Sequence, residues 1–172
     1  MPNRMEEMAS KAMGKAKEGK AAATGLTGVF RTLAEQHGEV SALLKRAKSS
    51  DDPARRTELW QKIRVELLSH ERAEMREVYP VLREYAETRT LAEHHDREAK
   101  ELESMISRLD GTDTHSDAWS DLLSKIADAV QHHATEEETE IFPTAQDTIG
   151  KPEAEKLDSK FLAAKQQITS QL

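Results

Sequence analysis

Cysteine is absent from this chain of 172 residues, and long apolar runs are absent as well. Without cysteine the chain can form no disulfide, iron-sulfur cluster or thiolate metal site, so nitrogen and oxygen atoms must hold any bound metal. No segment approaches the roughly 20 apolar residues that span a bilayer, and the N-terminus has no hydrophobic secretion signal. We therefore expect a cytoplasmic protein without a membrane partner.

Basic residues, glycine, proline and aromatic residues are also scarce. The 25 Lys and Arg residues are outnumbered by 32 Asp and Glu residues, which gives a net charge of -7. This balance argues against a nucleic-acid partner, because such a partner normally requires a basic surface. Aromatic residues make up 4%, with 7 glycines and 5 prolines, whereas charged residues make up 33%. This composition favours long helices over sheets, and the length fits one domain with terminal extensions.

Apolar residues recur at three- and four-residue spacing along most of the chain, which is typical of amphipathic helices. We predict helices over residues 26–48, 53–85, 88–109 and 117–146, followed by a final helix after a break at residues 150–152. Pro80 should kink or end the second helix locally. The predicted parts are a weakly helical N-terminal extension (residues 1–24), a helical bundle (25–150) and a C-terminal helix that packs on it (151–172).

Six polar residues stand within the apolar stripes, at positions where the helical pattern predicts buried side chains. Two of the helices carry an HxxxE module, in which a histidine and a glutamate four residues apart share one helix face. In each module a proline follows the histidine by ten residues. The six candidate site residues are His37, His70, Glu74, His95, His133 and Glu137.

An internal repeat links the two halves of the predicted bundle. Residues 32–37 (TLAEQH) and residues 90–95 (TLAEHH) agree at five of six positions, and each segment is followed by a helix with an HxxxE module. Two such helical hairpins predict an all-α fold, an up-down four-helix bundle with quasi-twofold symmetry. The inward polar residues of all four helices should then meet in the core.

The candidate set combines four imidazoles with two carboxylates, which is typical of a dinuclear metal site. Imidazole binds iron, zinc, copper or nickel, and a carboxylate can bridge two cations. Each buried polar group without a partner would cost about 2 kcal/mol or more, which disfavours the alternative of a metal-free structural bundle. A single histidine such as His37 would, on its own, be more typical of a hydrogen-bonded core residue.

The remaining histidines lie off the stripes. His94 and His132 are rotated by about 100° from their inward neighbours, and His115 lies in a predicted loop. No histidine has a glutamate three residues before it, which excludes the carboxylate bundles with an ExxH motif. The zinc-protease motif HExxH begins at His70 but fails, because Glu74 stands where its second histidine would be.

The order His, HxxxE, His, HxxxE, with an aromatic-proline pair closing each module, resembles the hemerythrin-like (HHE cation-binding) family over about residues 25–150. The resemblance implies a four-helix bundle around two non-heme iron ions with an oxo or hydroxo bridge. It also implies that Glu74 and Glu137 are bridging carboxylates. By the same resemblance the histidines divide into two sets, one for each iron: His37 with His70, and His95 with His133.

Ala99 departs from the family pattern. The oxygen-carrying hemerythrins have a fifth histidine four residues after that of the third helix, and alanine stands there in this chain. The resemblance therefore implies an iron with an open coordination place, unless Glu98 or a water fills it. We expect a protein that binds or reacts with oxygen, hydrogen peroxide or nitric oxide, including the option of a peroxide- or nitric-oxide-consuming enzyme. The alternative is an iron- or oxygen-sensing or storage module that signals through metal-dependent stability.

Overall fold

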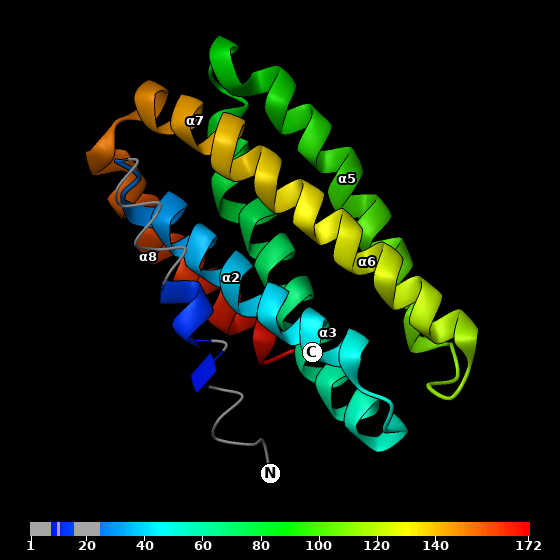
Figure 1. Cartoon of the computed structure of the whole chain (residues 1–172). Coiled ribbons are helices and arrows are strands. Elements are labelled where there is room, and N and C mark those ends of the chain that lie inside the picture. Colours follow the sequence, from blue (N-terminus) through cyan, green and yellow to red (C-terminus); the bar gives the residue numbers. More distant parts are fainter. Residues whose placement is uncertain (1–7, 10, 16–24) are drawn as a thin grey trace.

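The computed structural model describes residues 8, 9, 11–15 and 25–172, and this part of the chain is built from helices without a β-strand (Figure 1). The elements are α2 (Gly28–Ser49), α3 (Pro53–Ala73), η1 (Glu74–Val78), α4 (Tyr79–Leu82), α5 (Ala86–Asp110), α6 (Asp117–Glu136), η2 (Glu137–Ile141), α7 (Phe142–Ile149) and α8 (Lys151–Thr169), where η marks a π-helical turn. The predicted all-α class is confirmed for these residues. Among them, no helix is long and apolar enough to cross a membrane.

Capping side chains fix where two of the long helices begin. Asp52 accepts a hydrogen bond from the backbone N–H of Ala54 at 3.0 Å, and Ser116 accepts one from the N–H of Trp119 at 3.2 Å. Each cap satisfies a backbone donor that has no partner within its helix. Pro53 opens α3, where its missing N–H costs nothing. The predicted helix starts at residues 53 and 117 agree with these caps.

The long helices α2, α3, α5 and α6 form the body of the fold. α2 packs against α3 and α6, and α5 packs against α6 and α3. The C-terminal helix α8 lies along α2 and α3 (Figure 1) and buries Leu157 and Phe161 in the apolar core. Its approach to α2 is close, since a Cβ atom at Gly28 would lie 2.4 Å from the backbone carbonyl carbon of Ala154. Only glycine fits at this crossing.

The apolar interior is divided into two cores. One core contains Phe30 and Phe161, and the other contains Trp60 and Trp119. Along α2, His37 lies between the residues of the first core and those of the second. The polar candidate residues thus occupy a layer between two apolar regions, which shields them from solvent on both sides.

Both HxxxE modules run into a π-helical turn that begins at the glutamate. Glu74 opens η1 and Glu137 opens η2, and a proline follows each turn, at Pro80 and Pro143. Proline lacks an N–H, and in an α-helix its ring clashes with the carbonyl four residues earlier. That carbonyl belongs to the π turn in both modules, so the wider turn relieves the clash. The local break predicted at Pro80 is this turn.

The π turn corrects one detail of the predicted stripe. The sequence pattern places Val81 in the core, but Val81 is only partly buried and Leu82 is buried instead. A π turn holds about one residue more than an α turn, so the buried face moves on by one position after Val78. The helix also ends at Leu82 rather than at the predicted residue 85.

A short N-terminal segment packs on α2. Residues 11–15 are helical, and a Cβ atom at Gly38 would lie 2.8 Å from the carbonyl oxygen of Met13. The rest of the predicted extension, apart from residues 8 and 9, lies outside the described residues. The division of the chain into residues 1–24, 25–150 and 151–172 therefore stays a prediction.

Candidate metal centre

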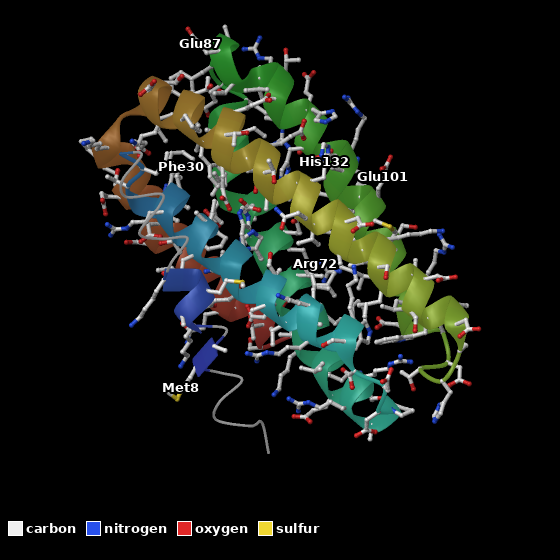
Figure 2. All side chains as sticks on the ribbon, in the orientation of Figure 1. Met8, Phe30, Arg72, Glu87, Glu101 and His132 are labelled. Atoms are coloured by element: carbon white, nitrogen blue, oxygen red, sulfur yellow. The ribbon has the colours of Figure 1, made fainter. Side chains whose placement is uncertain are left out.

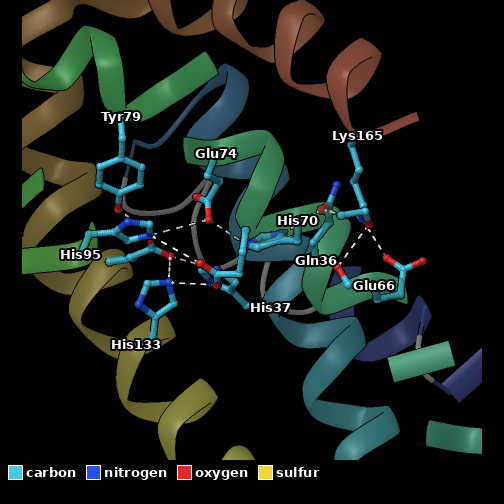
Figure 3. Close-up of polar contacts among 12 residues, drawn as sticks. Gln36, His37, Glu66, His70, Glu74, Tyr79, His95, His133 and Lys165 are labelled. Atoms are coloured by element: carbon cyan, nitrogen blue, oxygen red, sulfur yellow. Dashed lines mark hydrogen bonds and ion pairs between the residues drawn. The ribbon is translucent and has the colours of Figure 1, made fainter. Parts of the chain in front are cut away.

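The structure brings all six candidate residues together in the layer between the two cores. Figure 3 shows the side chains of His37, His70, Glu74, His95 and His133 in this layer. The six candidate residues come from α2, α3, η1, α5, α6 and η2, and none is more than 7% exposed. The sequence therefore predicted correctly that these six side chains point inward.

The inward residues form two groups in which potential ligand atoms lie within 4.8 Å of one another. The first group consists of His37, His70 and Glu137, and the second consists of Glu71, Glu74, His95 and His133. The histidines are thus paired as the family resemblance implies. The second group also contains a residue, Glu71, to which the sequence pattern assigned no metal role.

Glu74 and Glu137 belong to different groups, and each carboxylate lies close to histidines of both groups. Glu137 places Oε2 at 3.1 Å from His37 Nε2 and Oε1 at 3.4 Å from His95 Nε2. Glu74 places Oε2 at 3.2 Å from His70 Nε2 and at 4.0 Å from His95 Nε2. Each carboxylate therefore reaches histidines of both groups, which is the position that a bridging ligand requires.

Three of the four buried histidines share one orientation. Each of the three uses its outward Nδ1 atom for a hydrogen bond: His37 with Glu138 Oε1 (2.9 Å), His70 with Gln36 Oε1 (2.9 Å) and His133 with Glu98 Oε2 (3.3 Å). The inward Nε2 atoms of all four are buried without a hydrogen-bond partner among the described residues. A histidine that binds metal through Nε2 typically donates its Nδ1–H to such an outer acceptor, which fixes the tautomer and the ring.

Tyr79 covers His95 and holds Glu137. Its ring stacks on His95 with 3.6 Å between centroids, and its hydroxyl donates a hydrogen bond to Glu137 Oε1 at 2.5 Å. Burial and the neighbouring carboxylates raise the pKa of Tyr79 well above 10, so the hydroxyl keeps its proton. The other oxygen, Oε2, faces the histidines and has no hydrogen-bond partner among the residues that the structure describes.

The C-terminal helix reaches the centre through Lys165. Its Nζ donates to Gln36 Oε1 and to Glu66 Oε2, both at 2.8 Å, and Gln36 Oε1 in turn receives the Nδ1 hydrogen bond of His70 (Figure 3). Burial, together with the charge on His37, lowers the pKa of His70 well below 6.5. His70 is therefore a neutral imidazole, which is the form that binds metal.

Glu71 is buried beside the histidines of the second group. It is 4% exposed, with Oε1 at 3.3 Å from His133 Nε2 and Oε2 at 3.8 Å from His95 Nε2. Although burial alone would raise the pKa of Glu71, the charges of His133 and His95 lower it to about 2. A carboxylate thus stands among the ligand atoms where the sequence predicted only imidazoles and the two bridging glutamates.

The remaining inward groups divide between charged and neutral forms. Burial would lower the pKa of His133, but Glu137 and Glu71 raise it well above 6.5. Burial would raise the pKa of Glu137, but His133 and His37 hold it well below 4.5. Burial and the adjacent carboxylates raise the pKa of Glu74 well above 4.5, so it keeps a proton. The protons on Glu74 and His133 thus offset the negative charge of the buried carboxylates, and metal cations can replace these protons.

Two openings flank Ala99. A groove of about 440 Å³ is lined by Glu71, Met75 and Ala99, among others, and a narrower cavity of about 150 Å³ is lined by Glu71, Ala99 and His133 among its residues. Both reach Glu71 from the surface. Glu98, which the sequence offered as a substitute ligand, instead contacts the outward Nδ1 of His133. The short side chain at position 99 therefore lies beside Glu71 and next to solvent-accessible space.

Buried imidazoles and carboxylates inside a helical bundle define a helical cation-binding protein. Residues 28–145 match the family described as the Hemerythrin HHE cation binding domain, and the chain belongs to this family. A protein named DNA nickase from Nostoc sp. (strain PCC 7120 / SAG 25.82 / UTEX 2576) is 25% identical over 136 residues, which cover 79% of this chain and 38% of that protein. The chain thus spans well under half of that relative's length. No solved structure gives a significant match.

Proposed function

We propose that this chain is a non-heme di-iron protein that binds or reacts with a small diatomic or peroxidic ligand. The observation that carries the proposal is the set of four buried Nε2 atoms that face inward without a hydrogen-bond partner in the described part of the chain, beside carboxylate oxygens that also lack one there. Each such atom would cost about 1–3 kcal/mol if it stayed unsatisfied. Two cations held between the side chains would satisfy these atoms together.

In this proposal each iron takes one of the two groups of side chains. His37, His70 and Glu137 hold the first ion, and Glu71, Glu74, His95 and His133 hold the second. Glu74 and Glu137 bridge the ions, as the family resemblance implies. All four helices of an up-down bundle then supply ligands, and Glu71 takes the place that the fifth histidine fills in the oxygen-carrying hemerythrins.

The exchange of a neutral imidazole for a carboxylate favours reaction over oxygen storage. An iron ion in this pocket supplies Lewis-acid and redox chemistry to a small ligand. The negative charge of Glu71 stabilises the more highly charged oxidation state of a nearby ion, because the buried setting screens it poorly. Stable oxygen carriage requires that the lower oxidation state of the iron is readily restored. We therefore propose hydrogen peroxide or nitric oxide as the reacting ligand. The openings beside Ala99 give such a ligand access.

Metal analysis of anaerobically prepared, iron-loaded protein tests the di-iron proposal. We expect about two iron ions per chain and, once the loaded protein is exposed to oxygen, a near-ultraviolet absorption typical of an oxo-bridged diferric pair. His133→Ala and Glu137→Ala should lose iron, whereas His115→Ala should keep it, because His115 is 71% exposed and far along the chain from the inward set. One ion or none in the fully loaded parent protein would refute the proposal.

A second candidate function is iron or oxygen sensing, or storage, through metal-dependent stability. The observation in its favour is the chain of contacts from His70 through Gln36 to Lys165 on α8. A metal on His70 fixes its ring and strengthens the donor at Nδ1, which would favour docking of α8. Hydrogen exchange in α8 that slows on iron loading, in a protein that does not consume peroxide or nitric oxide, would favour sensing. Unchanged exchange would refute it.

The proposed partners are small ligands, in a cytoplasmic protein without nucleic-acid or membrane contacts. The nickase name of the Nostoc relative does not transfer, because the match covers 38% of that protein and this chain carries a net charge of -7. A plasmid nicking assay with the iron-loaded protein tests this point. Nicking that disappears in the His133→Ala variant would contradict it.

A further inference from the structure

A second set of histidines and glutamates lies on the surface where α5 and α6 face each other. His94 and Glu98 are four residues apart on α5, and His132 and Glu136 are four residues apart on α6. Both histidines directly precede inward ones in the sequence, so they project outward, as the helical phase predicted. Figure 2 places His132 on α6 beside α5.

The four side chains form a closed ring in which nitrogen and oxygen alternate. His94 Nε2 lies 3.4 Å from Glu98 Oε1 and 3.5 Å from Glu136 Oε2. His132 Nε2 lies 3.6 Å from the same Glu98 oxygen and 3.9 Å from the same Glu136 oxygen. A tetrahedral metal with bonds of roughly 2.0–2.1 Å places its ligand atoms about 3.3–3.4 Å apart. His94, Glu98 and Glu136 each place a ligand atom within 4.8 Å of the others, whereas His132 falls outside this set. An ion held by all four side chains therefore requires the exposed His132 ring to turn toward His94.

Hydrogen bonding does not account for the ring. Glu136 Oε2 is buried and has no hydrogen-bond partner among the described residues, although two imidazoles surround it. The separations of 3.4–3.9 Å exceed those of normal N–H···O bonds, whose usual length is about 2.9 Å. A buried carboxylate oxygen without a donor is destabilising unless a cation satisfies it.

We propose that His94, Glu98, His132 and Glu136 form an external binding site for one divalent transition-metal ion, separate from the buried centre. Two imidazoles and two carboxylates are a donor set that such ions accept. The carboxylates are 22% and 28% exposed, and the imidazoles are 45% and 66% exposed, so the ion enters from solvent onto partly desolvated oxygens. This site does not depend on the di-iron proposal, because it shares no inward ligand with it.

Glu98 links the external site to the buried one. Its Oε1 faces His94 and His132, while its Oε2 lies 3.3 Å from the Nδ1 of His133. An ion on Oε1 draws electron density from the carboxylate and weakens its hydrogen bond to His133. The cavity of about 150 Å³ between α5 and α6 is lined by Glu98 and His132 as well as by Glu71 and His133, so the two sites border one space.

One contact must yield when the ion binds. Arg97 Nη2 lies 3.4 Å from His94 Nδ1, as a donor to that nitrogen. A metal on Nε2 leaves the proton on Nδ1, so the guanidinium group has to turn away. The contact is long and lies on an exposed surface, so its loss costs little.

Cobalt(II) titration of the iron-loaded full-length protein tests the external site. We expect the parent to bind one more Co²⁺ than a His94→Ala/His132→Ala double variant, with visible absorption typical of four-coordinate Co²⁺. Each single variant should weaken this binding at least tenfold, while the iron content stays unchanged. His115→Ala is the matched control, since it removes another exposed histidine that contacts a carboxylate, and it should bind like the parent.

The comparison between parent and double variant is valid whatever the buried centre contains, because both proteins keep all the inward residues. Equal Co²⁺ stoichiometry and affinity in parent and double variant would overturn the external site.

Discussion

Replacing Glu71 by glutamine removes a buried charge while keeping the size of the side chain. Burial alone would raise the pKa of Glu71, but the charge and hydrogen bond of His133, together with the charges of His95 and His70, lower it from the usual 4.5 to about 2. At about 1.4 kcal/mol for each pKa unit, the ionised carboxylate contributes about 3 kcal/mol to the stability of the metal-free protein at neutral pH. Glu71→Gln should lower the free energy of unfolding by about that amount.

The sign of the pH dependence follows from the lowered pKa. A carboxylate with a depressed folded-state pKa stabilises the protein above pH 4.5, and this stabilisation is lost as the pH falls toward 2. The difference between parent and Glu71→Gln should therefore be full at pH 7 and about half as large near pH 3. Urea unfolding of both metal-free proteins at the two pH values measures it.

Glu103→Gln provides the matched control. Glu103 is paired with Arg72 at 2.5 Å, but both side chains are more than 40% exposed, so this pair contributes less than about 1 kcal/mol. Equal losses from Glu71→Gln and Glu103→Gln at pH 7 would refute the reasoning about burial. A Glu71→Gln loss that did not shrink in acid would refute the assignment of an ionised carboxylate.

Four further predictions concern the same centre. Chelating the metal should lower the Tm markedly, and equal Tm values for metal-free and loaded protein would mean that the inward groups are satisfied in another way. Metal-free protein should melt at lower temperature at pH 8.5 than at pH 6.5, because the raised pKa values of His37 and His133 give stability that is lost as the pH rises. The lowered pKa of His70 acts in the opposite sense, but it is one group against two. A Tm that rises with pH would contradict this prediction. Tyr79→Phe removes a hydrogen bond to a buried carboxylate and should cost about 1.5–3 kcal/mol in urea unfolding of the metal-free protein, and an unchanged midpoint would contradict the role of that bond. The Ala99→His variant should keep two iron ions and decompose peroxide more slowly, and overpacking should lower its free energy of unfolding by about 1–3 kcal/mol. If a crystal structure of the variant showed coordination by residue 99 and peroxide turnover were unchanged, the reaction would take place elsewhere.

The helices and the inward residues could be predicted because both follow from a regular period. On the fourth helix, the residues that the three- and four-residue spacing places inward are all buried: Trp119, Leu123, Ile126, Val130, His133, Glu137 and Ile141. The π turns could not be derived from the helical period of the apolar residues. One additional residue in a turn leaves the spacing of the apolar residues that precede the turn unchanged. Only the prolines that follow the turns hinted at a local break.

Glu71 escaped prediction because a stripe assumes that a helix buries one face. α3 packs against α2, α5 and α8, and its residues from Leu67 to Glu71 are all buried in succession. Glu71 therefore lies inward although it is rotated by about 100° from His70. The sequence signal was the adjacent pair Leu67 and Leu68, which widens the apolar face just before the module.

The division of the interior into two apolar cores has a consequence for cooperativity. Each core packs within itself, and the polar layer between them is the place where contact between the two ends depends on charged groups. With ions bound, the layer ties the ends into a single unfolding unit. Without them, the end that contains Phe161 and the end that contains Trp119 should open separately, so amide exchange would divide into two protection classes. Metal content would then determine how many protection classes amide exchange resolves, as well as how stable the protein is.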